Sequence, residues 1–238
     1  MPRVSMPATK RDSSLGWEHS PRTLREALPI FLRHGSPRIL LLLVGLALVG
    51  RLRMGGFSPF DLLAAAVVLL YWPIQEWLIH VFVLHARPFV LWGRSFDLPV
   101  PRSHRAHHQD PWNYRILFIP LHTYVYTVPI LVFLCFLIAP TRQLALTVLL
   151  VHLALTLHYE AVHFLVHTRV VPRASYYRRL WRNHRLHHFR NEHFWYGVTR
   201  LEGDRFFGTA PNVARVALSR SARTLEENAS QGATRSAG

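Results

Sequence analysis

The sequence predicts an all-α integral membrane protein with about four transmembrane helices and a cytoplasmic helical cap that holds a His-rich site for two metal ions. Two observations predict this architecture: long apolar runs without charged residues, and histidines that recur in spaced groups. With 238 residues, of which 50% are hydrophobic and 17% charged, the chain has room for one domain of ordinary size. A large multidomain protein is therefore excluded.

Four apolar runs account for the predicted membrane helices. Residues 39–50 contain only 12 uncharged residues, which fits either a spanning helix lengthened by snorkelling arginines or a re-entrant or interfacial segment. Residues 62–75 are uncharged, and we expect this helix to continue to His85. Residues 116–140 contain 25 residues without Asp, Glu, Lys or Arg, enough to cross a hydrocarbon core that needs about 20 helical residues. Residues 143–159 follow after so short a connection that the last two helices must be antiparallel.

The distribution of basic residues predicts the orientation. Of the 28 Lys and Arg residues, seven lie in residues 1–38, five in residues 86–115 and 13 after residue 168. The positive-inside rule places these segments in the cytoplasm. We therefore expect the cytoplasmic membrane of a bacterium, with the metal site on its cytoplasmic side. Nucleic-acid binding is disfavoured despite the formal charge of +15, because the basic residues are distributed according to the side of the membrane and no nucleic-acid recognition motif accompanies them.

Composition also divides the chain into three parts. Residues 1–25 are predicted to be a disordered basic N-terminus, residues 26–212 the membrane domain, and residues 213–238 a disordered or partly helical tail. The single cysteine, Cys135, lies in an apolar run. An intramolecular disulfide and a Cys-based metal site are therefore excluded.

Ten of the 16 histidines fall into four groups, and these ten are the candidate metal ligands. The groups are His80 and His85; His104, His107 and His108; His163 and His167; and His184, His187 and His188. They form a loose internal duplication, in which a membrane helix ends in a spaced His pair and a His-x-x-His-His triplet follows after a short connection. An even number of membrane crossings separates the two halves, so both reach the same membrane face.

Spacing indicates which imidazoles can share a metal. At about 100° per residue, the histidines of a triplet project from one helical face, and His163 and His167 lie one turn apart. His80 and His85 are about 140° apart on an ideal helix, so they either bind two different metals or lie where the helix unwinds. Ten imidazoles exceed what one four-coordinate zinc uses, which favours two metals with all-His ligation. Imidazole suits iron, zinc, copper and nickel alike, so the ligand type leaves the metal open.

Two acidic residues and one tyrosine are candidates for orienting these ligands. Glu76 lies one turn before His80, and Glu160 lies three residues before His163. Both carboxylates can accept a hydrogen bond from an imidazole and fix its orientation, and Tyr159 can act similarly. The alternative is that the carboxylates are helix-end charges that reach water.

Other interpretations of the histidines remain open. The six ungrouped histidines are expected to be packed or surface residues, namely His19, His34, His122, His152, His158 and His193. The grouped histidines could instead belong to a non-catalytic membrane metal-binding or transport protein, or to a structural zinc site. A transporter, however, is expected to place ionisable ligands near the bilayer midplane rather than at helix ends.

Taken together, these motifs resemble the fatty acid hydroxylase superfamily, also called the sterol desaturase family. The resemblance covers about residues 60–210 and is carried by His80-x4-His85, by HRAHHQDPWNYRILFIP from His104, by YEAVHFLVH ending at His167 and by NHRLHHFRNEHFWYGVTRLEGDRFFGT ending at Thr209. Pro111, Arg115 and the GVT and FGT strings are most similar to the fatty acid 2-hydroxylase branch.

This resemblance implies an integral-membrane, non-haem di-iron enzyme that hydroxylates or desaturates a lipid with dioxygen and two supplied electrons. It implies that the ten grouped histidines bind two iron ions, for which zinc could substitute in a preparation. The N-terminal segment carries no fused haem-binding donor domain of the kind found in many eukaryotic members, so we expect an external donor of cytochrome or ferredoxin type. The resemblance leaves the substrate open, because branches of the family handle fatty acyl chains, ceramides, sterols and carotenoids. We expect a fatty acyl chain, with a carotenoid or sterol as the alternative.

Overall fold

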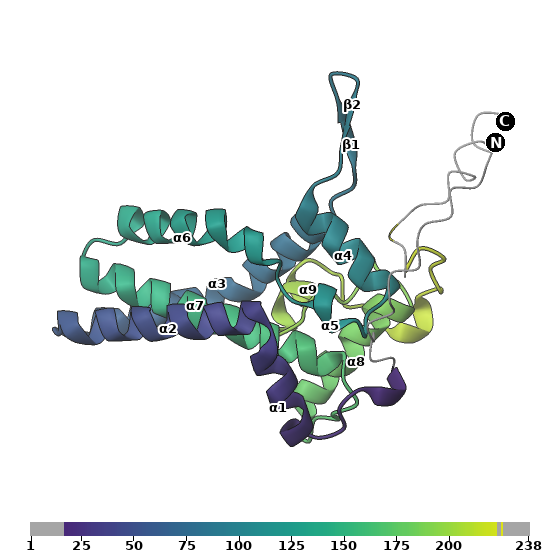
Figure 1. Cartoon of the computed structure of the whole chain (residues 1–238), viewed down its shortest axis with the longest axis horizontal. Coiled ribbons are helices and arrows are strands. Elements are labelled where there is room, and N and C mark those ends of the chain that lie inside the picture. The colour runs from purple at the N-terminus through teal and green to yellow at the C-terminus, as the bar shows by residue number, and fades with distance from the viewer. Residues whose placement is uncertain (1–16, 223–224, 226–238) are drawn as a thin grey trace.

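The computed structural model describes residues 17–222 and residue 225, and this part of the chain is mostly helical (Figure 1). Its α-helices are α1 Leu24–Arg33, α2 Gly35–Met54, α3 Pro59–Ile79, α4 Pro99–Gln109, α5 Tyr114–Leu117, α6 Tyr124–Ile138, α7 Arg142–Val166, α8 Ser175–Phe189 and α9 Glu202–Phe206. A π-helical turn, η2 (His80–Leu84), continues α3, and short 3-10 turns occupy Trp17–His19, Leu121–Thr123 and Val213–Arg215. Two strands, β1 (Phe89–Leu91) and β2 (Arg94–Phe96), form an antiparallel hairpin that the sequence interpretation did not include.

Four helical segments are long and apolar enough to cross a membrane, which confirms the predicted number. They are Gly35–Met54, Pro59–Leu84, Tyr114–Ile138 and Arg142–Val166. Their outward side chains are apolar and exposed, as lipid-facing surfaces require; examples are Leu62 at 77%, Val125 at 78% and Ile138 at 77% exposure. Figure 1 shows α2, α6 and α7 extending together from one end of the molecule.

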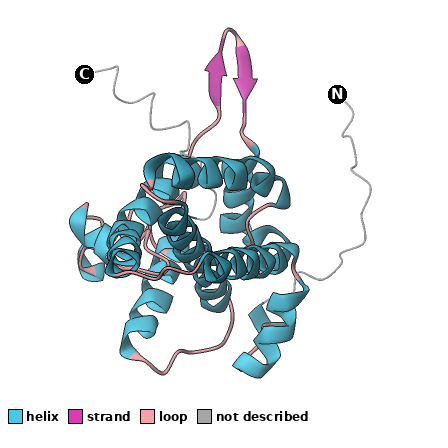
Figure 2. Cartoon of the chain, turned by 90° about the vertical axis from the view of Figure 1, so that its left-hand side faces the viewer, coloured by secondary structure: helices cyan, strands magenta, loops and turns pink. Residues whose placement is uncertain are grey.

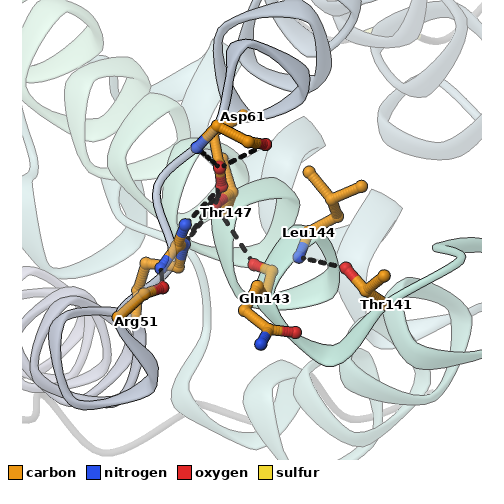
Figure 3. A network of polar contacts seen from close by, with 8 residues as sticks. Arg51, Asp61, Thr141, Gln143, Leu144 and Thr147 are labelled. Atoms are coloured by element: carbon orange, nitrogen blue, oxygen red, sulfur yellow. Dashed lines mark hydrogen bonds and ion pairs between the residues drawn. The ribbon is translucent and has the colours of Figure 1, made fainter.

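The first of these segments is longer than its uncharged run because Arg51 is buried and paired inside the bundle (Figure 3). The Arg51 guanidinium donates to Oδ1 of Asp61 at 2.7 Å, to Oγ1 of Thr147 at 2.8 Å and to the Gly55 carbonyl at 2.7 Å. Asp61 also accepts from the Ser58 amide in a capping box that starts α3. Helix α2 can therefore pass through a charged residue that would otherwise have ended its apolar run.

The bundle is held by an apolar seam between α2, α6 and α7. Its fully buried members are Leu40, Ala47, Cys135, Ala145, Leu149 and Leu153. At the turn between α6 and α7, the Thr141 hydroxyl accepts from the Leu144 amide and caps α7 (Figure 3). This tight turn makes α6 and α7 antiparallel, as predicted, and brings the ends of α3 and α7 to the same face.

The remaining helices form a cap at that face (Figure 1). Helices α4 and α8 each carry one His-x-x-His-His triplet, and the loop between α8 and α9 lies against α3. Figure 2 views the molecule end-on from the bundle and shows the β1–β2 hairpin standing apart from the helices. The cap therefore assembles the segments that follow the two His pairs.

Parts of both predicted terminal segments pack onto this cap. Ser20, within the segment predicted as disordered, is buried and hydrogen-bonds Tyr114, while residues 1–16 lie outside the described residues. In the predicted tail, the Val216 carbonyl accepts from Arg190 and the Ala222 carbonyl approaches His108 at 2.8 Å. The packed region therefore extends beyond both ends of residues 26–212, and residues 223–224 and 226–238 lie outside the described residues.

Candidate metal centre

The ten grouped histidines lie together in the cap as two sets of five. The first group is His80, His85, His104, His108 and His187, and the second group is His107, His163, His167, His184 and His188. Within each group, one ring nitrogen from every histidine lies within 4.8 Å of all the others. All are buried except His85, which is half-buried. The six ungrouped histidines lie outside both groups, as expected.

The two halves of the chain exchange one histidine each. In α4, His104 and His108 point into the first group, whereas His107 points into the second. In α8 the arrangement is reversed: His184 and His188 belong to the second group, and His187 belongs to the first. Positions i and i+4 are about 40° apart around a helix, whereas i+3 lies on the other side of i. The His-x-x-His-His spacing therefore sends its middle histidine to the neighbouring group.

The π-helical turn explains the five-residue spacing of His80 and His85. The His85 amide donates to the His80 carbonyl at 3.1 Å, an i to i+5 bond that widens the helix at its end. The two rings lie 5.0 Å apart and belong to the same group. Of the two options left by the spacing, local unwinding of the α-helix is thus correct, and binding to two different metals is wrong.

Hydrogen bonds to the outer ring nitrogens of two histidines aim their inner nitrogens at the centre of the first group. Because a carbonyl can only accept, the Nδ1–H groups donate: His80 to Tyr196 at 2.6 Å and His187 to Phe194 at 2.8 Å. Their Nε2 atoms are then left as lone-pair donors for a metal. The Nε2 atom of His80 is buried and has no hydrogen-bond partner within the described part of the chain.

The spacing of the inner nitrogens fits metal ligation. The Nε2 atoms of His104 and His108 are 3.2 Å apart, and those of His184 and His188 are 3.1 Å apart. Adjacent ligands at about 2.1 Å from one ion, separated by roughly 90–100°, would be about 3.0–3.2 Å apart. The two groups therefore fit one ion each, without any Cys or carboxylate ligand.

Burial keeps these imidazoles in the form that binds metals. Desolvation lowers the pKa of His108 to about 4 and holds the pKa of His104 and His107 well below the usual value. The same cause lowers the pKa of His184 and His188 of α8. All five are neutral near pH 7, and a neutral imidazole offers its lone pair to a cation.

The predicted orienting residue Glu76 contacts backbone rather than an imidazole. Its carboxylate accepts from the amides of Val198 and Thr199, the latter at 2.9 Å, from Trp72 Nε1 at 3.0 Å and from the Thr199 hydroxyl. Glu76 thus fixes the loop whose Tyr196 carbonyl orients His80. Its influence on the metal site passes through this loop, so the predicted direct bond to an imidazole is wrong.

The other two predicted orienting residues support the metal site through packing and backbone contacts. Glu160 is buried and accepts from the Ile119 amide at 2.8 Å, which links α7 to the segment before α6. The ring of Tyr159 lies 5.6 Å from that of His163, a packing contact. Both residues lie on α7, which carries His163 and leads to His167.

Sequence reasoning missed Asp204, which binds the two amides of the same loop that precede those bound by Glu76. Its carboxylate accepts from the amides of Tyr196 at 2.9 Å and Gly197 at 2.8 Å and from the Thr209 hydroxyl at 2.6 Å. A side chain on Gly197 would overlap the Arg200 carbonyl. The GVT and FGT strings therefore close one hydrogen-bonded loop, and the signal available in the sequence was the aspartate that lies between the two strings.

A cavity of about 430 Å³ lies between α3, α7 and α8, next to the Glu76 network. Leu69 and Leu155 contribute apolar walls from two membrane-crossing segments. Its polar lining includes His158, Tyr177 and Arg200, and the His158 ring nitrogen lies 3.2 Å from the Tyr177 hydroxyl. Trp72 and Thr199, which hydrogen-bond each other and Glu76, also line the cavity.

Four segments long and apolar enough to cross a membrane lie beneath a cap with two five-histidine groups that could each hold a metal ion, which defines an integral-membrane protein with a candidate metal centre. Residues 65–209 match the fatty acid hydroxylase family, so the chain belongs to this family. The match includes all ten grouped histidines and the Asp204 loop.

Two curated relatives are plant enzymes. The chain is 28% identical over 157 residues to the dihydroceramide fatty acyl 2-hydroxylase FAH2 of Arabidopsis thaliana, covering 65% of this chain and 63% of the relative. It is 26% identical over 152 residues to the dihydroceramide fatty acyl 2-hydroxylase FAH1 of the same plant, covering 60% and 58%. The chain thus spans less than two thirds of the length of either relative.

One solved structure has the same fold. Full-length Scs7p, of which only the hydroxylase domain is visible, superposes with a TM-score of 0.59 and 22% sequence identity. The superposition covers 86% of this chain and 70% of the other. At this identity the likeness establishes the arrangement of helices.

Proposed function

We propose that this protein is a membrane-bound, non-haem di-iron oxygenase that hydroxylates the fatty acyl chain of a lipid. The observation that carries the proposal is the pair of neighbouring five-histidine groups at the ends of membrane-crossing helices. Membership of the fatty acid hydroxylase family and two relatives named as fatty acyl 2-hydroxylases support the reaction.

The ten grouped histidines would hold the two iron ions, one in each group. Iron with dioxygen and two electrons supplies the oxidising power needed to break an unactivated C–H bond, which side chains alone do not provide. The protein's own contribution is to keep the imidazoles neutral, to aim their Nε2 atoms through carbonyl contacts such as that of Tyr196, and to exclude water by burial.

The substrate we propose is an acyl lipid with a polar head, such as an amide-linked sphingolipid. Hydroxylation next to the acyl carbonyl requires that the polar head lie close to the metals. The lining of the cavity between α3, α7 and α8 supports this choice, since Leu69 and Leu155 suit an acyl chain whereas Tyr177 and Arg200 suit a polar head. Its wall of Trp72 and Thr199 adjoins the network that holds the loop before the metal centre.

We further propose that the metal centre faces the cytoplasm, where a soluble cytochrome or ferredoxin-type donor would supply electrons. The described parts of the basic segments 1–38, 86–115 and 169–238 belong to the side that carries the cap, which supports this orientation. A bacterial cytoplasmic membrane remains a prediction, because both relatives come from a plant.

Metal content and lipid analysis of the full chain test the proposal together. His107→Ala and His187→Ala each remove the ligand that crosses between halves, and we expect loss of hydroxylated fatty acids with a fall in bound iron. His193→Ala is the matched control, because its exposed ring lies beside the cap but outside both groups. Purified protein that binds at most one iron per chain, or lipids unchanged by removal of the protein, would contradict the proposal.

The same experiment separates the alternatives. Feeding membranes with ceramide, sterol and carotenoid identifies which class gains a hydroxyl group, and an oxygenated sterol or carotenoid would redirect the substrate assignment. A metal-transport function would appear as metal flux lost in His107→Ala with no lipid product in any variant.

A further inference from the structure

We propose that the β1–β2 hairpin is a membrane anchor whose aromatic face and tip insert into the interface of the anionic leaflet on the side of the metal centre. This inference is independent of the proposed reaction. It assigns the surface one partner, the phospholipid head-group region of the membrane that the helices cross.

The hairpin exposes a cluster of apolar side chains that would be unfavourable on a protein surface in contact with water. All six strand residues are exposed. Pairing of Phe89 with Phe96 and of Leu91 with Arg94 places these four side chains on one face, where the two phenyl rings stack at 5.6 Å. Trp92 at the tip is 90% exposed. An isolated two-stranded hairpin is marginally stable in water, so this one needs a partner.

The turn conformation also indicates an outside partner. Trp92 and Gly93 both have positive φ, 49° and 73°, and they form the two-residue loop between Leu91 and Arg94. Such turns prefer Asn-Gly, because a side chain at the first position is strained by about 1–3 kcal/mol. A tryptophan held there without burial inside the described chain gains its compensating contact elsewhere.

Geometry selects the membrane over a soluble partner. Figures 1 and 2 both show the hairpin projecting sideways, across the direction of the membrane helices, so that it runs along the plane of the bilayer. It begins five residues after Leu84, where a membrane-crossing segment ends. Tryptophan favours the head-group level, where its ring is amphipathic.

Charge favours an anionic leaflet. Residues 86–96 contain no Asp or Glu, and Arg94 extends from the same face as the aromatic rings. Lys or Arg near an anionic surface contributes about 1 kcal/mol each. The first acidic residue, Asp97, is already paired: it accepts from Arg102 at 2.9 Å and contacts Arg105.

The base of the hairpin is tied to the helix that carries three candidate ligands. Arg105 of α4 contacts Asp97 after β2 and donates to the Ala86 carbonyl before β1 at 3.0 Å. His104 precedes Arg105 directly. Seating the hairpin in the interface therefore fixes α4 relative to the bilayer.

Site-specific fluorescence in lipid nanodiscs tests the anchor. In a Cys135→Ala background, we would attach an environment-sensitive dye to Leu91→Cys and, as a water-exposed control, to Arg173→Cys. We expect spin-labelled lipid to quench the dye at 91 and not at 173, and iodide in the buffer to quench only 173. The difference in lipid quenching between positions 91 and 173 should increase from neutral to anionic lipid. The same difference should be smaller in Arg94→Gln.

The outcomes are distinct. Iodide quenching at 91 equal to that at 173 would overturn the proposal, and protection from both quenchers would replace the membrane by a protein contact. Trp92→Asn separates anchoring from folding, because Asn-Gly suits this turn better than Trp-Gly. In that variant lipid quenching at 91 should fall by at least half with the helical content unchanged; undiminished quenching would refute the role of Trp92.

Discussion

Gly203 lies where the cap packs closely against a membrane helix. A Cβ atom at this position would overlap the Pro73 carbonyl oxygen and would lie 3.0 Å from Cβ of Trp77, both in α3. Gly203→Ala must therefore push α9 away from α3. Overpacking of this kind lowers the free energy of unfolding by about 1–3 kcal/mol. For a chain of this size each kcal/mol corresponds to roughly 2–4 °C, so the unfolding temperature should fall by about 2–12 °C.

Gly45→Ala is the matched control for this substitution. Gly45 lies inside α2, and a methyl group added there would have no described atom within 4 Å. Alanine should therefore leave the unfolding temperature unchanged or raise it, since it favours a helix by about 1 kcal/mol over glycine. Thermal unfolding in nanodiscs compares the two. Because α9 carries Asp204, iron content should also fall in Gly203→Ala. Equal unfolding temperatures for the two variants would refute the packing argument.

Three further outcomes follow from the contacts. Asp61→Ala leaves the Arg51 charge buried without its carboxylate and should lower the unfolding temperature. The double variant Arg51→Met/Asp61→Leu should be more stable than Asp61→Ala. A double variant less stable than Asp61→Ala would contradict this. Asp204→Asn should lower iron content through the loop that orients His80, and full iron content would exclude that route. Leu155→Trp should reduce hydroxylated lipid with iron content unchanged, and undiminished product would remove the cavity as the substrate site.

The membrane helices could be predicted because their signal is local. A run such as residues 116–140 specifies burial in lipid by its length and composition alone. The first helix was ambiguous because Arg51 interrupts its apolar run. Its true length depends on the contacts with Asp61 and Thr147, which lie 10 and 96 residues away and which no local pattern could pair.

The clustering of the histidines was also predictable, but their division between the groups was not. Helical spacing places His104, His107 and His108 within one fan of directions. Which of these histidines faces which five-histidine group depends on how α4 and α8 lie against α3 and α7. The supporting carbonyls of Phe194, Tyr196 and Ala222 have no side-chain signature and could not be found from the sequence.

The hairpin escaped prediction for a related reason. Each strand has only three residues and neither contributes to a core, so no buried periodic face marked them. The Trp-Gly turn is also an unusual sequence for a two-residue loop. Its apolar residues were therefore grouped with a basic connecting segment.

The exchange of His107 and His187 determines how close the two five-histidine groups must be. His107 and His108 are consecutive residues, with Cα atoms about 3.8 Å apart, yet they belong to different groups. Across the groups, the rings of His108 and His188 stack with centroids 4.0 Å apart. Because each triplet contributes to both groups, neither group can move without displacing a helix that also holds the other. The His-x-x-His-His spacing thus ties the two groups into one centre, as the proposed action of two ions on a single substrate requires.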